Sequence, residues 1–308
     1  MIFSRINIRI KIAVISLFVI PLGYLNYQLF VPIKNFPVGK VFEIEKGESA
    51  GEIFVNLEKQ GFIRDARWAK VLNKIFQYNK FYPGEYEFET PESVYNVVFN
   101  ITKRPVSYAV LIPEGFTKKQ VAERVAKYVK NFDQKKFLAE AQEGYLFPDT
   151  YYFFKYSTAE EVLKEMNDKF NKETFLKLGK APTKSDVIIA SMLEREARDP
   201  NDMKIIAGIY YNRLDIGMPL QVDATVLYGQ GAWKERTLYR DLKHDSDYNT
   251  YKNKGLPIGP ISNPGINSLT AAMNPTNNDY LYYLTGKDGK MYYAKDFDTH
   301  VKNRKYLR

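Results

Sequence analysis

The feature that most constrains this chain is an uncharged stretch near its N-terminus, from residue 12 to residue 33. At about 1.5 Å per residue, a helix of this length can cross a hydrocarbon core about 30 Å thick. Basic residues and no acidic residue precede the stretch, so the positive-inside rule predicts a cytoplasmic N-terminus. No small-x-small pair follows it, which favours an uncleaved anchor over a signal peptide. We therefore predict a cytoplasmic tail at residues 1–11, a transmembrane helix at 12–33 and an extracytoplasmic remainder.

The composition excludes several kinds of functional site. The chain has no cysteine and two histidines, so it cannot form a disulfide, a Cys-ligated zinc site, an iron–sulfur cluster, a thiol nucleophile or a three-histidine metal site. Hydrophobic residues make up 45% of the chain, enough for a sizeable core, which excludes a disordered protein. The net charge of +9 indicates an anionic neighbour, which could be nucleic acid, a phospholipid surface or an acidic polymer.

After the uncharged stretch, the hydrophobic pattern predicts short strands and helices in alternation. Residues 34–40 contain proline and glycine and are typical of a short stalk. Residues 41–105 have a strand, helix, helix, strand pattern, followed by a further helix. From residue 159 the pattern is mainly helical, and a loop-rich region of the kind that usually carries function follows Gly217. We therefore predict an α+β fold, with a small module at 41–105 and a larger domain at 106–308.

Two acidic residues end a predicted helix whose N-cap is Thr183. The helix is apolar on nearly every side up to Leu193, so we expect it to be buried. Glu194 and Glu196 follow, about 200° apart around the axis, and we expect only one of them to point into any given cleft. Burial favours the protonated form of a carboxyl group, as a general acid requires. An exposed, salt-bridged helix end would give the same pattern, and the periodicity does not choose between the two acids.

A polar face is predicted in the segment at residues 220–226. Apolar residues alternate along it, which would place Gln221, Asp223 and Thr225 together on one face of a strand. Amide, carboxylate and hydroxyl groups at this spacing suit the recognition of sugar hydroxyls or an acetamido group. A solvated strand face would have the same pattern.

Several motifs occur in one order along the chain: residues 112–115 (IPEG), 143–151 (EGYLFPDTY), Glu194-x-Glu196, 212–214 (NRL), 220–229 (LQVDATVLYG), 248–251 (YNTY) and 255–265 (GLPIGPISNPG). Together they resemble the endolytic murein transglycosylases, the MltG or YceG-like family, over about residues 41–302. The resemblance implies a membrane-anchored LysM-like module at 41–105. A catalytic domain at 106–308 would follow it and cut peptidoglycan glycan strands internally. One departure is Ile258, where proline is expected.

The resemblance implies that Glu194 is the catalytic residue. Glycosidases usually need two carboxylates, whereas a lytic transglycosylase needs one, because the substrate supplies the nucleophile. Glu194 would protonate the β-1,4 glycosidic oxygen between N-acetylmuramic acid and N-acetylglucosamine. It would then accept the proton of the muramic C6 hydroxyl as a 1,6-anhydro ring closes, so no metal or organic cofactor is needed. Glu196 is interpreted as a structural or supporting acid. The candidates for holding sugars or orienting the acid are Gln221, Asp223, Thr225, Tyr228 and Asn263.

The resemblance also implies partners and a location. We expect a single-pass protein of the cytoplasmic membrane that cleaves nascent glycan strands, terminates their elongation and cooperates with peptidoglycan synthases. The alternative is a non-catalytic, membrane-tethered peptidoglycan-binding or scaffold protein, whose glycan affinity would not depend on Glu194. A nucleic-acid binder is disfavoured, because the positive charges are scattered and no nucleic-acid motif is present.

Overall fold

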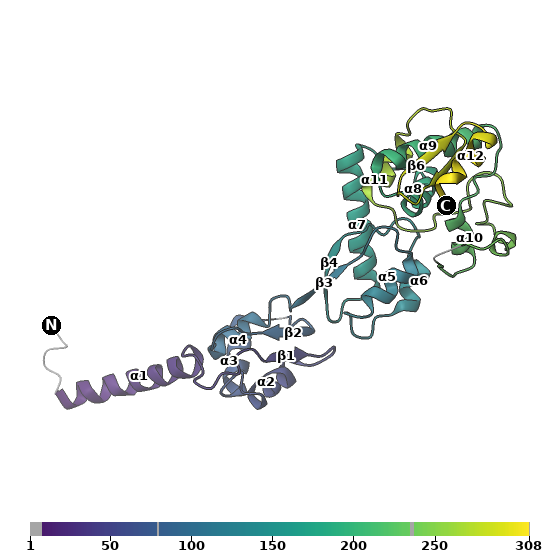
Figure 1. Cartoon of the computed structure of the whole chain (residues 1–308). Helices are drawn as coiled ribbons and strands as arrows, with labels where there is room; N and C mark the ends of the chain where they lie inside the picture. Colours follow the sequence, from purple (N-terminus) through teal and green to yellow (C-terminus); the bar gives the residue numbers. More distant parts are fainter. Residues whose placement is uncertain (1–7, 79, 235–236, 308) are drawn as a thin grey trace. The chain divides into compact units, whose positions relative to one another are not determined.

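The computed structural model describes residues 8–78, 80–234 and 237–307, with side chains from residue 16 onward. The chain forms two compact units (Figure 1). The N-terminal unit comprises residues 1–108 and 154–156, and the C-terminal unit comprises residues 109–153 and 157–308. Both contain helices and short strands, so the predicted α+β class is confirmed.

The N-terminal unit is built around a small antiparallel sheet. Its elements are α1 (Ile8–Leu29), β1 (Val41–Ile44), α2 (Ala50–Lys59), α3 (Ala66–Phe76), β2 (Gly84–Glu87) and α4 (Val94–Asn100). Buried residues of both strands and of α2, α3 and α4 form one core. A capping box between Ser49 and Glu52 starts α2, and Ser93 caps α4. The order of elements from residue 41 to residue 87 follows the predicted pattern, while the likeness to a LysM module stays a prediction.

Helix α1 covers most of the predicted transmembrane segment. The first part of the predicted cytoplasmic tail, residues 1–7, lies outside the described residues. As far as side chains are described, no helix is both long enough and apolar enough to cross a membrane, so the predicted span at 12–33 is not confirmed. The helix ends at Leu29, which is buried in the core of the N-terminal unit. Beyond it, Arg64 donates hydrogen bonds to the carbonyls of Val31 and Pro32 at 2.9 and 2.8 Å.

The segment after α1 is packed, so the prediction of a stalk at residues 34–40 is wrong. Phe36 is buried, and its ring lies 5.6 Å from the rings of both Phe62 and Phe88. The backbone N–H of Gly39 donates to the carbonyl of Phe88 at 3.1 Å. The aromatic side chain in the middle of the segment explains the difference, because proline and glycine alone indicate a turn but say nothing of what packs beside them.

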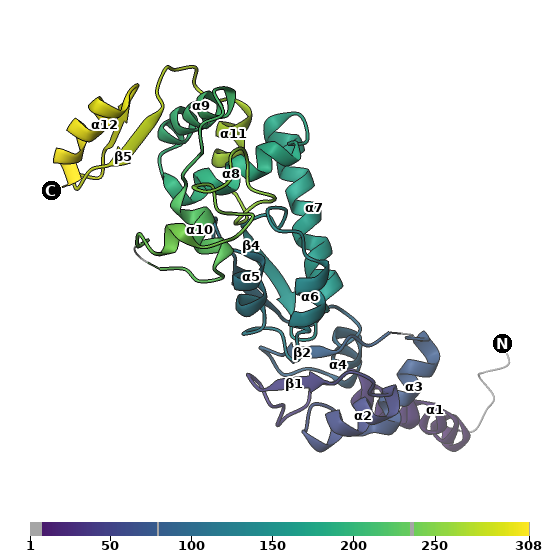
Figure 2. The same ribbon diagram turned by 90° about the vertical axis from the view of Figure 1, so that its right-hand side faces the viewer.

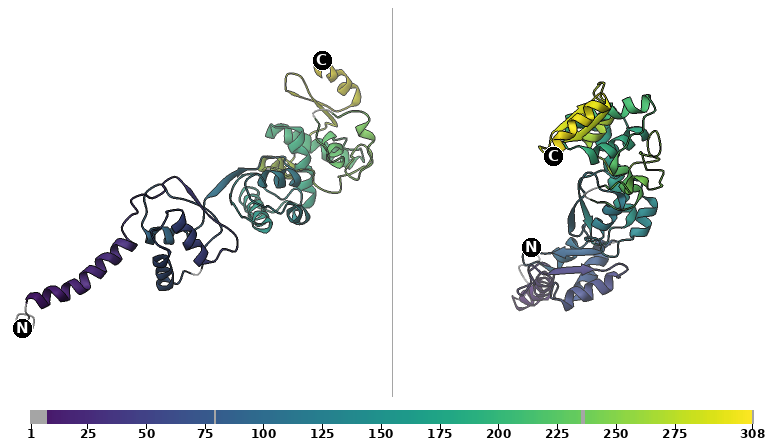
Figure 3. Two further views of the ribbon diagram at one scale, coloured as in Figure 1. Left: turned by 90° about the horizontal axis from the view of Figure 1, so that it is seen from below. Right: turned by 45° about the vertical axis from the view of Figure 1, so that its right-hand side comes forward.

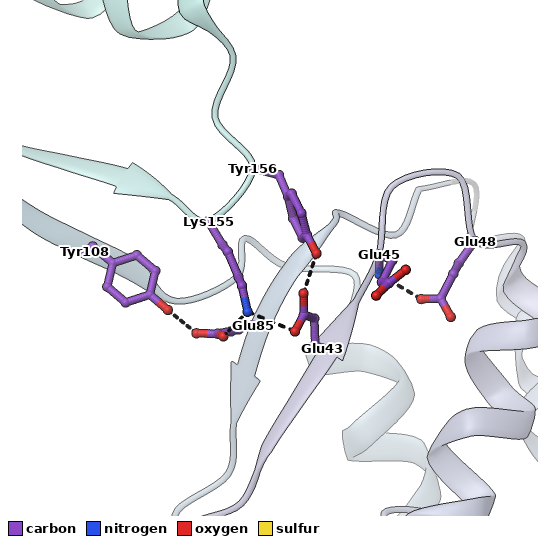
Figure 4. Close-up of polar contacts among 7 residues, drawn as sticks. All are labelled: Glu43, Glu45, Glu48, Glu85, Tyr108, Lys155 and Tyr156. Atoms are coloured by element: carbon purple, nitrogen blue, oxygen red, sulfur yellow. Dashed lines mark hydrogen bonds and ion pairs between the residues drawn. The ribbon is translucent and has the colours of Figure 1, made fainter. Parts of the chain in front are cut away.

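A cluster of charged and tyrosine side chains gathers on the β1–β2 sheet; we call it the Lys155 cluster (Figure 4). Glu43 and Glu85 lie directly opposite each other in the strand pairing, where like charges repel. The ammonium of Lys155 lies between them, 2.8 Å from Glu43 and in contact with Glu85. Tyr156 and Tyr108 donate hydrogen bonds to Glu43 and Glu85, respectively. One cation from a distant segment therefore neutralises two facing carboxylates.

The C-terminal unit contains a group of helices, one strand pair and most residues of a second strand pair. β3 (Ser107–Leu111) pairs with β4 (Thr150–Phe154), and β5 (Tyr282–Thr285) pairs antiparallel with β6 (Met291–Ala294). The β5–β6 hairpin and α12 lie together at the C-terminal end of the chain (Figure 3). The helices are α5 (Lys118–Val125), α6 (Gln134–Glu140), α7 (Ala159–Leu178), α8 (Lys184–Glu196), α9 (Pro200–Asp215), α10 (Asp223–Gly229), α11 (Ile266–Met273) and α12 (Phe297–Asn303).

Helix α8 forms the centre of the C-terminal unit. A capping box between Thr183 and Asp186 starts it, as the sequence predicts. Helices α9 and α11 pack against α8 (Figure 2), and its residues 187–193 are buried in the core. The prediction of a buried helix that ends in two acidic residues is therefore confirmed.

Candidate active site

Glu194 lies in the last turn of α8. Its carboxylate oxygen Oε2 accepts hydrogen bonds from the backbone N–H of Gly265 at 2.9 Å and from the Ser268 hydroxyl at 2.7 Å. Gly265 is the N-cap of α11, and the N-terminus of a helix offers N–H groups that have no partner inside the helix. The start of α11 therefore fixes one oxygen of Glu194. Sequence reasoning missed Ser268, because a serine in the first turn of a helix has no distinguishing pattern.

The loop that carries Gly265 runs alongside α8. The backbone N–H of Ile261 donates to the hydroxyl oxygen of Ser191 at 3.0 Å. The hydroxyl of Ser262 donates to the backbone carbonyl of Ser191, also at 3.0 Å. Because Ser191 precedes Glu194 by about one helical turn, the loop is bonded to α8 at two successive turns. The position of the N–H that holds Glu194 is thus set by the helix that carries Glu194.

A second carboxylate, that of Glu114, lies beside the same loop. A Cβ atom on Gly265 would lie 1.9 Å from Oε1 of Glu114, so a larger residue at this position would force the Glu114 side chain to move. The residue after Glu114, Gly115, has a φ of +75° and packs against the Glu194 side chain. Burial raises the pKa of Glu114, and the negative charge of Glu194 raises it further. The sequence motif includes Glu114, but sequence reasoning assigned it no role.

A cavity of about 580 Å³ opens at the end of α8. Residues 194–199 and Asp202 line one side of it, and Thr285, Gly289 and Met291 of the β5–β6 hairpin line another. Both Glu194 and Glu196 contribute to the lining, so the expectation that only one of them faces a given cleft is wrong. The cavity lies around the end of α8, where the consecutive residues 194–199 all line it. Residues on different faces of the helix therefore reach the same space.

Glu196 is the last residue of α8 and has an unusual environment for an acid. The hydroxyl of Tyr283 donates to its Oε2 at 2.9 Å. Burial raises the pKa of Glu196 to about 7; the charge of Asp223 acts in the same direction, while Tyr283 and Arg213 oppose the shift. Glu196 therefore changes protonation state near neutral pH.

The predicted polar strand at residues 220–226 is wrong, because α10 begins at Asp223. Gln221 is exposed and has a left-handed backbone with φ of +53°. Asp223 is exposed and accepts a hydrogen bond from the hydroxyl of Tyr251. Thr225 is fully buried, and its hydroxyl lies 2.9 Å from that of Thr250. The three predicted sugar contacts therefore do not share a face.

Asn263 is fully buried, and its side-chain amide is fully hydrogen-bonded within the protein. The amide oxygen accepts from the backbone N–H groups of Gly144 and Leu146, both at 2.9 Å. The amide nitrogen donates to the carbonyl of Phe116 at 2.8 Å and to Glu143 at 3.0 Å. No hydrogen-bonding capacity of the amide is left for a sugar. The geometry favours the other predicted role of Asn263, which is to orient the site, because it lies two residues before Gly265.

Tyr228 belongs to the same buried network. Its hydroxyl donates to Oε2 of Glu143 at 3.0 Å, while the backbone N–H of Lys118 donates to Oε1 at 2.8 Å. Burial raises the pKa of Glu143 to about 7 in spite of these donors. Sequence reasoning named Tyr228 as a candidate for holding sugars or orienting the acid, and it gave Glu143 no role. The structure places the Tyr228 hydroxyl against this buried acid.

The candidate site consists of one carboxylate with two fixed donors, a neighbouring carboxylate and a cavity. In the part of the chain that the structure describes, no group of three or more histidine, aspartate and glutamate residues is placed to hold a metal ion.

Known proteins share both the sequence and the fold of this chain. The sequence model of the YceG-like family matches residues 42–306. The chain belongs to the YceG-like family. The endolytic murein transglycosylase of Bacillus subtilis strain 168 is 33% identical, and the match covers 86% of this chain and 84% of that protein. The endolytic murein transglycosylase of Streptococcus pneumoniae R6 is 29% identical over 91% of this chain, which spans 61% of the pneumococcal protein.

A solved structure gives the same result for the fold. The 2.6 Å crystal structure of a YceG-like protein from Listeria monocytogenes has a TM-score of 0.56 and 32% sequence identity. The match covers 86% of this chain and 98% of that chain. The resemblance that the sequence motifs indicate is therefore confirmed at the level of the family.

Proposed function

We propose that this protein is an endolytic peptidoglycan lytic transglycosylase in which Glu194 is the catalytic acid and base. Two relatives in the family carry the name endolytic murein transglycosylase. The observation that carries the assignment is the position of Glu194 at the edge of a sugar-sized cavity, with one carboxylate oxygen fixed by Gly265 and Ser268. The bond cut is the β-1,4 bond between N-acetylmuramic acid and N-acetylglucosamine.

The hydrogen bonds of Glu194 suit a residue that acts first as an acid and then as a base. Both bonds fall on Oε2, so a proton on Oε1 competes with neither of them. The protonated Oε1 donates to the glycosidic oxygen, and the bond from that oxygen to the muramic C1 breaks. The muramic C6 hydroxyl then attacks C1 and gives its proton to Glu194, which closes the 1,6-anhydro ring. No water and no second carboxylate takes part.

The Ser268 hydroxyl can accommodate both protonation states of Glu194. Its hydroxyl has one proton and two acceptors within reach, Oε2 of Glu194 at 2.7 Å and the carbonyl of Gly265 at 3.0 Å. It can donate to Glu194 while that group is charged and turn to Gly265 while it is neutral. Rotation of the Ser268 hydroxyl is therefore enough to match the charge on Glu194, and the backbone does not need to move.

A glycoside hydrolase is the second candidate, because Glu114 lies beside the loop that holds Glu194. A hydrolase would use Glu114 to activate water or to attack C1, and its products would have ordinary reducing ends. The two reactions therefore differ in their products and not only in their rates.

Mass spectrometry of uncrosslinked glycan strands treated with the full-length chain tests the proposal. We expect internal fragments with 1,6-anhydro ends from the wild type and from the exposed-acid control Glu140→Gln, and none from Glu194→Gln. Ordinary reducing ends would establish the hydrolase. Binding without cleavage by the wild type would favour the non-catalytic, tethered peptidoglycan-binding protein.

The proposal extends to location and partners. We place the protein in the cytoplasmic membrane as a single-pass protein, with the N-terminus inside and Glu194 outside, where it would cut nascent strands beside peptidoglycan synthases and terminate their elongation. The uncharged stretch at residues 12–33 and its basic flank support this location. Retention of the chain in the membrane pellet at alkaline pH, lost in a Leu17→Glu/Ile20→Glu variant, would test it. Release of the wild type into the supernatant would contradict it.

A further inference from the structure

The β5–β6 hairpin presents one face to the end of α8 and the start of α9. Its register pairs Tyr283 with Tyr293, and side chains two residues apart on a strand share a face. On this face, Tyr283 donates to Glu196 at 2.9 Å and Tyr293 donates to Asp202 at 2.6 Å. Two tyrosine–acid hydrogen bonds therefore join the hairpin to the helices.

The same face continues into the cavity. Thr285 and Met291 are the next register pair on this face toward the turn, and both line the cavity together with Gly289 of the turn. Glu194 lines the cavity from α8. The hairpin is thus one wall of the space in which the proposed catalytic carboxylate acts.

The base of the hairpin is fixed to α9 by the Asn-Arg motif. The side-chain amide of Asn212 donates to the carbonyl of Tyr280 at 2.9 Å. The guanidinium of Arg213 donates to the carbonyl of Leu281 at 2.6 Å. This motif contributes to the family resemblance, and nothing in the proposed chemistry uses it. Its contacts assign it to the attachment of the hairpin.

Tyr283 is held on both sides of its hydroxyl. It donates to Glu196, and the hydroxyl of Tyr210 on α9 lies 3.1 Å away. Glu196 is two residues from Glu194 on the same helix, so one helix end sets the positions of the carboxylate and of the wall. A shift of this bond would change the width of the cavity and leave Glu194 in place.

We propose that Glu196 is a positioning residue that holds the hairpin, through Tyr283, as the wall opposite Glu194, and that the glycan strand lies between the hairpin and the end of α8. This rests on the proposed function. The bond shapes the binding space and touches no reacting atom, so its loss weakens the binding of substrate and transition state alike. KM then rises while kcat stays nearly constant.

Kinetics of the full-length chain on uncrosslinked glycan strands test this inference. We expect Glu196→Ala and Tyr283→Phe each to raise KM about tenfold, the effect of losing one hydrogen bond, with kcat within about twofold. Glu196→Gln keeps an oxygen that accepts from Tyr283, so its KM stays close to the wild-type value. The matched control is Tyr292→Phe on the other face of the hairpin, where the hydroxyl binds Asp288.

Binding in a Glu194→Gln background separates this inference from the proposed function. The affinity for glycan strands should fall about tenfold when Tyr283→Phe is added, whether or not Glu194 is catalytic. An unchanged affinity would overturn the inference and leave the proposed function intact. A large fall of kcat in both Glu196→Gln and Glu196→Ala would also overturn it, because Glu196 would then act on the substrate itself.

A further variant tests the inference if the Glu196 and Tyr283 variants fail to fold. Thr285→Trp adds a bulky side chain on the exposed wall of the cavity and leaves the bond between Tyr283 and Glu196 untouched. It should raise KM by obstructing the strand. An unchanged KM in a folded Thr285→Trp protein would show that the strand does not lie against the hairpin.

Discussion

Replacement of Lys155 by methionine tests whether the Lys155 cluster stabilises the N-terminal unit by charge. Methionine has a similar length and can pack in the same space, but it cannot neutralise Glu43 and Glu85. In the wild type, burial acts to raise the pKa of Glu85, yet the hydrogen bonds from Lys155 and Tyr108 hold it below its ordinary value. The variant leaves two facing carboxylates without their shared cation.

The expected loss is about 2 kcal/mol in the free energy of unfolding at pH 7. The two facing carboxylates, with charges about 5 Å apart, repel each other by about 3 kcal/mol at an effective dielectric constant of about 20. The exposed fractions are 18% for Lys155, 30% for Glu43 and 20% for Glu85, so solvent screens part of this energy. The expected loss is therefore smaller than the 3–5 kcal/mol, roughly, that breaking a fully buried ion pair costs. It is larger than the cost of breaking a surface pair, which is less than about 1 kcal/mol.

Urea unfolding followed by Trp68 fluorescence measures this loss. The chain has two tryptophans, and a Trp233→Phe background leaves Trp68 as the reporter of the N-terminal unit. The control is Arg67→Met, which removes an ion pair with Asp65 whose guanidinium side is 88% exposed, and it should leave the midpoint unchanged.

The dependence on pH distinguishes charge from packing. The lowered pKa of Glu85 means that its contribution is present above its ordinary pKa and is lost as pH falls through the lowered value. In Lys155→Met the facing carboxylates repel, so acidification toward pH 4 relieves the variant. The difference between the two proteins should therefore shrink as pH falls. A loss of the same size at pH 4 and pH 7 would refute the reasoning, because it would come from packing.

Three further predictions concern the C-terminal unit. Ser268→Ala removes the hydroxyl that donates a hydrogen bond to the Glu194 carboxylate, so kcat should fall about tenfold at constant KM in the glycan-strand assay. In Glu194→Gln, the pKa of Glu114 should fall but stay above its ordinary value, because burial is the larger cause of its shift; carbon NMR titration measures it. Glu143 has a pKa near 7, so its contribution to stability is present below about pH 4.5 and is lost as pH rises through 7. Glu143→Gln should remove up to about 3 kcal/mol of that dependence, measured by urea unfolding at pH 5 and pH 8.

Each of these predictions has an outcome that contradicts it. A kcat within twofold of the wild type for Ser268→Ala would mean that the Gly265 N–H alone orients Glu194. An unchanged pKa of Glu114 in Glu194→Gln would mean that the two carboxylates do not interact. A pH dependence of stability that is the same with and without Glu143 would place that dependence in other groups, of which Glu196 is the first to test.

Local patterns predicted the parts of the fold that local interactions decide. The N-cap at Thr183 and the mainly apolar residues 187–193 indicate a buried helix, and α8 begins directly after Thr183 and includes these residues. The two acids at the end of this helix, Glu194 and Glu196, stand out in the same way, and the family resemblance rather than the local pattern singles out Glu194. Neither inference needed a contact with a distant part of the chain.

Residues 220–226 show why a periodic pattern can mislead. Apolar residues alternate along the sequence, but residues 224–227 are all buried in α10, so no polar face reveals the helical period. A short helix that is buried on most sides cannot be told from a strand by periodicity. The prediction of three sugar contacts on one strand face failed for this reason.

The role of Asn263 could not be read from the sequence for a different reason. Three of its hydrogen bonds go to backbone groups, those of Gly144, Leu146 and Phe116, more than a hundred residues away. Any residue type can supply a backbone group, so the partners leave no signature in their own identities. The facing pair of Glu43 and Glu85 is similar, since it makes sense only with Lys155 present.

The end of α1 has a consequence for how the N-terminal unit can move. Leu29 and Phe36 are part of the core, and Arg64 ties the carbonyls that follow the helix, so no loose segment separates α1 from the unit. A helix held in a bilayer through a loose linker would let its cargo swing. Here a tilt of α1 would tilt the N-terminal unit with it. In the membrane-anchored protein that we propose, bilayer thickness, by setting the tilt of α1, would therefore set the direction in which the N-terminal unit faces.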